Sequence, residues 1–172
     1  MGAVNGSLLS DAFGHHMWAT LTLLDTCAKL NDEQLATSVP GTYGPILGTA
    51  RHLAQADRLY LFVLNGGRTP LIDASAMSLP EVRDIMESHG PAWAALLEQD
   101  LEPAKVIVRR RADGSETHAP IGVRLAQALH HGTDHRSQIC TALTVLGLEP
   151  PDIDVWAYAA ATERLIEIPR KS

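Results

Sequence analysis

The sequence predicts an all-α protein, an antiparallel four-helix bundle with an extra C-terminal helix and a short hairpin or irregular excursion before the fourth helix. Apolar residues recur at helical spacing along most of the chain, and β-branched residues cluster only just before the turn "ADGSE" at 112–116. The length of 172 residues suits one ordinary domain, here expected to span 1–172.

The first two helices are expected over residues 8–30 and 45–64. Residues 31–45, "NDEQLATSVPGTYGP", are rich in Gly, Pro and Thr and predict a connection between them. The second helix begins with a proline, which the first turn tolerates, and "NGG" closes it. The first helix carries a stripe of apolar or small residues typical of a helix packed on other helices: Leu9, Phe13, Thr20, Leu23, Leu24, Cys27 and Leu30.

A third helix is expected over residues 80–99, where Ser78 has the place of an N-cap and Glu81 follows three residues later. Gly90-Pro91 in its middle predicts a kink or a break. The fourth helix should cover 121–146 and end at Gly147, and the fifth should cover 152–168.

The net charge of −6 opposes attraction to phosphate backbones, so nucleic acid is not an expected partner. The basic run Arg109-Arg110-Arg111 is interpreted as a solvated face beside an exposed turn. No apolar run approaches the roughly 18 residues of a membrane span, and the N-terminus lacks the pattern of a secretory signal, so a cytoplasmic protein is expected. Cys27 and Cys140 lie in helical patterns and are expected to be reduced, buried thiols.

The segment "LHHGTDHRSQI" at 129–139 holds three of the eight histidines. On a helix, His131 and His135 would share one face about one turn apart, as two adjacent ligands of a metal ion do. That spacing alone is a weak signal, and a single buried histidine is more often a hydrogen-bonded core residue. His52 and His16, each on a different helix, strengthen the case for a metal site.

Three segments carry a resemblance to a known family. "PIGVRLAQALHHGTDHRSQI", "HHMWATLTLLDTCAKLNDEQL" and "GTYGPILGTARHLAQADRLYL" are similar to helices of the DinB-like (YfiT-like) family. The resemblance implies a DinB-type bundle, usually dimeric, with a divalent metal held by His52, His131 and His135. The chain departs from the family pattern at His130 and Thr20, where family members often have Asn.

The resemblance also implies a class of activity. Characterised relatives include thiol S-transferases and a mycothiol-dependent maleylpyruvate isomerase, so a metal-dependent transferase that delivers a low-molecular-weight thiol to a small electrophile is the leading hypothesis. Zinc is the expected metal, with nickel as the second choice, and a homodimer is the expected assembly. Metal-dependent hydrolysis and a non-catalytic metal-binding or interaction module remain alternatives.

Other residues near the expected site have more than one candidate role, and no catalytic residue is assigned. His16 would line the pocket, carry a proton or lie in the core, and Gln138 would hydrogen-bond a ligand. Arg136 is interpreted as a structural pairing residue rather than an anion-binding one. Asp57 and Asp134 are both candidates for orienting the metal-binding imidazoles.

Overall fold

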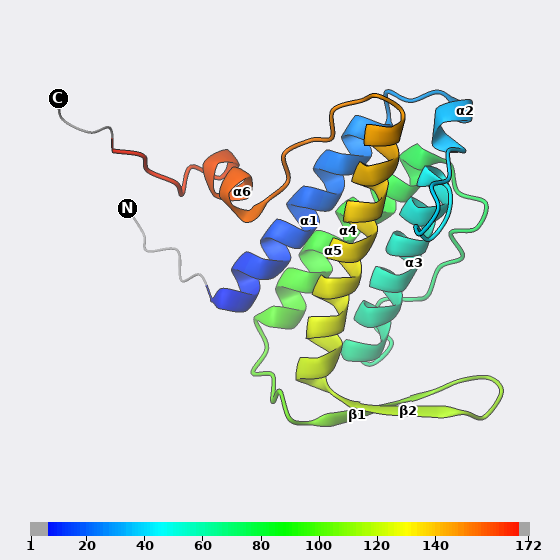
Figure 1. Ribbon diagram of the computed structural model, residues 1–172. Coiled ribbons are helices and arrows are strands. Elements are labelled where there is room, and N and C mark those ends of the chain that lie inside the picture. The colour runs from blue at the N-terminus through cyan, green and yellow to red at the C-terminus, as the bar shows by residue number, and fades with distance from the viewer. Residues whose placement is uncertain (1–6, 169–172) are drawn as a thin grey trace.

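The computed structural model describes residues 7–168, and four long helices packed side by side form the body of the molecule (Figure 1). The predicted all-α bundle and its hairpin are confirmed. In the part of the chain that is described, no helix combines the length and the apolar character needed to cross a membrane. The long helices are α1 (Leu8–Cys27), α3 (Ile46–Leu64), α4 (Leu79–Leu97) and α5 (Ile121–Val145).

The bundle consists of two antiparallel pairs, α1 with α4 and α3 with α5, while α3 and α4 run in the same direction (Figure 1). The parallel arrangement requires a long connection. Residues 65–78 can extend about 46 Å, more than the roughly 28 Å length of α3. Arg51 near the start of α3 donates a hydrogen bond to the carbonyl of Met77 just before α4, which holds the two helix starts side by side.

Local signals set several helix ends where they were predicted. At the start of α4, Glu81 Oε2 accepts hydrogen bonds from the Ser78 backbone N–H at 2.7 Å and hydroxyl at 2.6 Å. The helix α5 begins after Pro120, and Gly147 follows its end with φ +74°, a left-handed conformation that glycine adopts without strain.

Of the two outcomes predicted at Gly90-Pro91, a kink or a break, the break is wrong, because α4 continues through Pro91. Pro91 has no N–H to donate to the preceding turn, which costs the helix one hydrogen bond. Tertiary packing on both sides offsets this loss. The buried residues that hold the helix on either side of the proline are Met86, His89, Trp93 and Leu96.

Two further elements decorate the bundle. The short helix α2 (Asp32–Leu35) lies in the segment predicted as a plain connection, where Asn31 and Gln34 form a reciprocal cap and Leu35 is buried. The strands β1 (Val106–Arg110) and β2 (Glu116–Pro120) form an antiparallel hairpin before α5. Its Arg110 side chain is exposed and donates to Glu116 at 2.7 Å, as expected for a solvated face.

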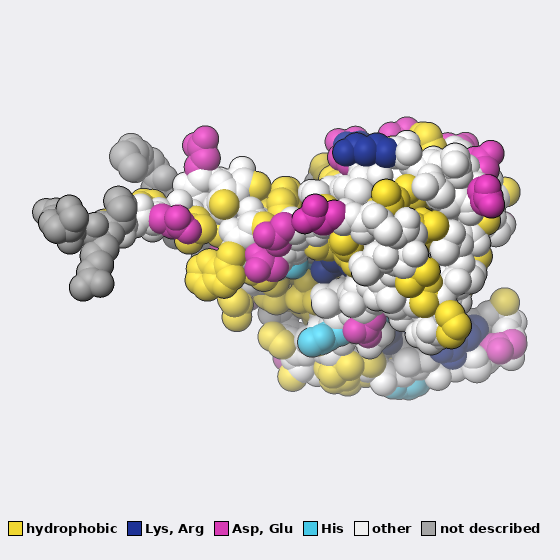
Figure 2. All heavy atoms as spheres, turned by 45° about the horizontal axis from the view of Figure 1, so that its top comes forward, with side chains coloured by type: hydrophobic (Ala, Val, Ile, Leu, Met, Phe, Trp, Pro, Cys, Tyr) yellow, Lys and Arg dark blue, Asp and Glu magenta, His cyan; other side chains and the backbone are white. Residues whose placement is uncertain are grey.

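The last predicted helix is much shorter than residues 152–168: α6 covers only Val155–Ala161. Asp154 caps its start, and Glu163 with φ +56° follows its end. No residue of α6 is buried. Because packing of an apolar face supplies most of the stability of a helix in a protein, little favours a longer helix here. The helix α6 lies against α1, where the Tyr158 ring packs on Trp18 with centroids 5.6 Å apart. The space-filling view shows hydrophobic and acidic side chains exposed on the outer side of this segment (Figure 2).

Candidate metal centre

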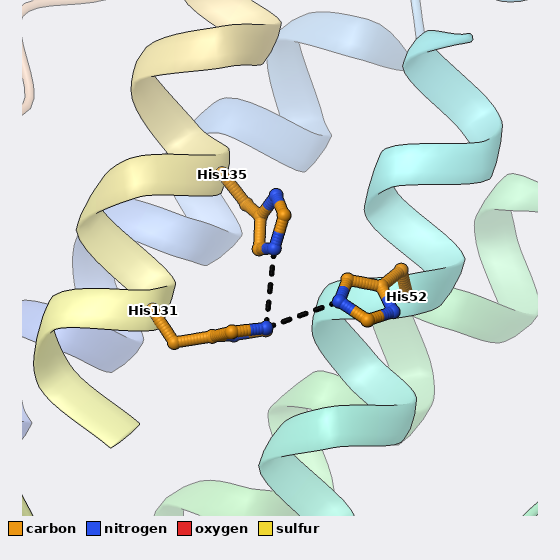
Figure 3. A group of neighbouring side chains, drawn as sticks. All are labelled: His52, His131 and His135. Carbon is orange, nitrogen blue, oxygen red and sulfur yellow. Dashed lines mark hydrogen bonds between the residues drawn. The ribbon is translucent and has the colours of Figure 1, made fainter. Parts of the chain in front are cut away.

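Three imidazoles from two helices converge between α3 and α5 (Figure 3). The Nε2 atom of His131 lies 3.0 Å from Nε2 of His52 and 3.1 Å from Nε2 of His135. One ring nitrogen from each residue lies within 4.8 Å of the others. The structure therefore brings together the three histidines named from the sequence as metal ligands.

Burial keeps these imidazoles ready to act as ligands. Burial, together with the neighbouring rings of His135 and His52, lowers the pKa of His131 to about 4. Burial and the ring of His135 also lower the pKa of His52. A neutral imidazole offers a lone pair to a metal, so both residues are in the ligand-competent form at neutral pH.

Gln138 sets the orientation and the tautomer of His135. The backbone N–H of Tyr43 donates to Gln138 Oε1 at 3.0 Å, which identifies that side-chain atom as the oxygen. The same oxygen lies 3.0 Å from His135 Nδ1, so Nδ1 carries the proton and donates it. In the neutral ring, Nε2 is then a lone pair directed at the other two histidines. Gln138, expected to contact a ligand, orients a candidate ligand residue instead.

The donor set suits a divalent cation of the zinc or nickel type. Hydrogen bonds cannot satisfy the cluster fully, because a single proton on His131 Nε2 can be donated to only one of its two neighbours. A cation would accept all three lone pairs at once. Within residues 7–168, the group that could hold an ion consists of imidazoles only, without a carboxylate or thiolate, so a bound dication would keep its full charge.

Two tyrosines, not singled out in the sequence, flank the three histidines. The Tyr43 ring stacks on His52 with centroids 4.0 Å apart and meets His135 edge-on at 5.2 Å. The Tyr60 ring lies edge-on to His131 at 5.8 Å. Tyr60 follows His52 by two turns of α3, a spacing that could have identified it. Tyr43 lies in an irregular connection, where no periodic signal exists.

The aspartate Asp57 lies in a separate buried network and does not contact the three histidines. Its carboxylate accepts hydrogen bonds from His16 Nε2 at 3.0 Å, from His89 Nδ1 at 2.7 Å and from Trp93 Nε1 at 2.9 Å. His16 thus has the core position that was its alternative role. The other candidate carboxylate, Asp134, is exposed on α5.

Two arginines close this network at its ends and fix its protons. Arg136 donates to His16 Nδ1 at 2.9 Å, and Arg58 donates to His89 Nε2 at 2.9 Å. A guanidinium only donates, so each histidine is neutral and its remaining ring proton points to Asp57. Burial alone would raise the pKa of Asp57, but the hydrogen bonds from His16 and His89 hold it well below its usual range.

Arg136 has the structural role expected for it. Its guanidinium also donates to Thr20 Oγ1 at 3.2 Å, and burial lowers its pKa to about 10, which leaves it charged at neutral pH. It follows His135 directly on α5. The network therefore connects all four long helices at the level of the three histidines.

Comparison with known proteins places the chain in a family. The sequence model of the DinB family matches residues 4–170. A comparison with curated proteins gives no match.

Proposed function

Because this chain belongs to the DinB family, we propose that it is a metal-dependent thiol S-transferase acting on small electrophiles. The observation that carries the proposal is the convergence of His52, His131 and His135 on one point. Each would bind a divalent metal through Nε2, zinc being the first expectation and nickel the second. When bound, such an ion lowers the pKa of a thiol that coordinates it, which turns the thiol into a nucleophile at neutral pH.

The protein's own residues prepare the site for that chemistry. Gln138 holds His135 in the tautomer with a free Nε2, and the exposed Tyr43 ring covers one face of His52. His52 and His131 are only half-buried, so a small molecule can reach them from solvent. An all-imidazole donor set adds no negative charge to oppose a thiolate.

Transferase activity is tested on protein loaded with zinc and dialysed. A small thiol such as cysteine or glutathione is mixed with 1-chloro-2,4-dinitrobenzene, and absorbance follows the thioether. In this reaction a carbon–sulfur bond forms, chloride leaves and the thiol proton passes to solvent. We expect thiol-dependent turnover that disappears in His131→Ala together with the bound metal. The matched control is His118→Ala, which removes an exposed histidine of the hairpin.

The outcomes separate the alternatives. Hydrolysis of a simple ester without any thiol would favour a hydrolase. Stable metal binding with neither reaction would favour a non-catalytic module. Retention of the metal by His131→Ala would overturn the ligand assignment itself.

The proposed assembly is a homodimer. The helix α6 contacts α1 on one side, yet none of its residues is fully buried. The residue Trp156 on this helix is 69% exposed. A second copy of the chain would cover this surface. Light scattering should give twice the chain mass for the wild type and a monomer for Trp156→Ser, and a wild-type monomer at high concentration would contradict the proposal.

A further inference from the structure

An open cavity of about 310 Å³ adjoins the candidate metal centre. It shares His52 and the Tyr43 ring with that centre and extends over the outer face of α3. Its size is at the lower end for small-molecule sites. The residues that line it are Tyr43, Gly48, Arg51, His52, Gln55 and Ser75.

The polar groups that line this cavity are mainly hydrogen-bond donors. Arg51 is held by its Nε, which donates to the Met77 carbonyl at 2.6 Å. Its terminal nitrogens have no hydrogen-bond partner among residues 7–168. The Oε1 atom of Gln55 accepts the Ala74 N–H at 3.2 Å, so the Gln55 side chain has its NH₂ group left to donate.

The local charge also favours an anion. The lining residues include one guanidinium and no carboxylate. The nearby Glu81 and Asp73 carboxylates, the first of which attracts the Arg51 charge, lie outside the lining and accept hydrogen bonds from Ser78 and Ser75. A dication at the three histidines would add positive charge beside the cavity. A guanidinium with free terminal N–H groups matches the two oxygens of a carboxylate.

We propose that this cavity is a carboxylate-binding subsite of the candidate metal centre, with Arg51 and Gln55 as the residues that recognise the carboxylate. The inference rests on the proposed thiol transfer and narrows its ligand class. The carboxylate belongs either to the thiol or to the electrophile. In both cases the subsite anchors one end of a small anionic molecule beside His52.

The first test compares two thiols that differ in a carboxylate. The probe is cobalt-loaded protein, whose visible absorption changes when a thiolate coordinates the metal. We expect 3-mercaptopropionate to bind about ten-fold or more tightly than 2-mercaptoethanol, as a charge-assisted hydrogen bond allows. Arg51→Gln should remove this preference by lowering the affinity for 3-mercaptopropionate, so that the ratio of the two affinities falls to about one. Arg83→Gln, which alters an exposed arginine paired with Asp25, is the matched control and should keep the preference.

A second test finds the carboxylate when the electrophile carries it. Maleate is titrated into metal-free protein and followed by the backbone amide signals of Gly48, Gln55 and Ser75. We expect saturable shifts that Arg51→Gln abolishes and that Gln55→Leu weakens, with circular dichroism confirming that both variants are folded. Maleate shifts that depend on Arg51, without a thiol preference, would assign the carboxylate to the electrophile.

The two proposals fail in different ways. If neither thiol changes the cobalt spectrum, thiol activation is wrong, while the maleate titration still decides the subsite. If the two thiols bind equally and maleate causes no shift that depends on Arg51, the carboxylate subsite is wrong.

Discussion

Gly132 on α5 lies against His16 on α1 with no space for a side chain between them. A methyl group at position 132 would lie 2.6 Å from His16 Nδ1 and 3.0 Å from the Arg136 guanidinium. Both contacts are closer than unstrained atoms allow. This glycine lets α1 and α5 approach at the level of His131 and His135, so the helix that presents two candidate ligands is fixed by a contact on the neighbouring face of the helix.

Replacing Gly132 by alanine should therefore destabilise the protein. In an open helix the same change stabilises by about 0.5–1 kcal/mol, but here we expect a loss of about 1–3 kcal/mol because the methyl group overpacks the core. Urea unfolding measures the difference. Gly48→Ala in α3, where a methyl group would meet only the Pro45 ring at an ordinary contact distance of 3.4 Å or more, is the control and should be neutral or stabilising. Equal gains in both variants would disprove the steric argument.

Asp57→Asn should be strongly destabilising. The amide cannot carry the charge that the two arginines and two histidines are arranged around, and its NH₂ group would face ring N–H donors. Removing one partner of a buried ionic network costs about 3–5 kcal/mol. Chemical denaturation at neutral pH measures the loss. The exposed Asp134→Asn on the neighbouring helix should change stability by less than about 0.5 kcal/mol.

The same carboxylate predicts how acid affects the protein. The pKa of Asp57 is lower in the folded than in the unfolded state. The ionised carboxylate therefore stabilises the fold fully at pH values above the pKa of the unfolded state, about 3.9. The stabilisation falls as the pH drops below that value. In Asp57→Asn this part of the acid transition should be absent, and an unchanged transition would contradict the assignment.

Gln138→Ala should weaken metal binding by about 10–100-fold, because His135 loses the acceptor that fixes its tautomer. Gln138→Glu keeps an acceptor oxygen for His135 Nδ1 and for the Tyr43 N–H, so it should retain most of the affinity. Competition with a chromophoric chelator measures both variants. Gln99→Ala, distant from the three histidines, serves as the control. Unchanged affinity in Gln138→Ala would remove this residue from the site.

The Cys27 thiol should be unreactive in the folded protein. Burial, with a smaller contribution from Cys140, raises its pKa to about 12. The pKa of this thiol is 9.0 in the unfolded chain, so its contribution to folding stability is complete below pH 9.0. That contribution falls as the pH rises toward about 12. In a Cys140→Ser variant, iodoacetamide at pH 8 should modify Cys27 slowly until urea is added. Rapid labelling of the native protein would show that the thiol is accessible.

The sequence predicted the long helices because their apolar stripes and end signals are local. The directions of α3 and α4 were not predictable in the same way, since helical periodicity is identical for both directions. The candidate ligands were found because His131 and His135 share a helix face and the family resemblance supplied His52. The partners of Asp57 were missed, because His16 and His89 come from distant parts of the chain and no spacing rule relates them.

The bond from the Tyr43 backbone N–H to Gln138 has a consequence for protein engineering. A backbone donor survives almost any side-chain change at position 43, proline excepted. Inserting or deleting one residue in the segment between α2 and α3 would instead move this N–H away from its acceptor. The length of that segment is therefore one variable through which the affinity of the proposed metal site could be changed without altering any of the three histidines.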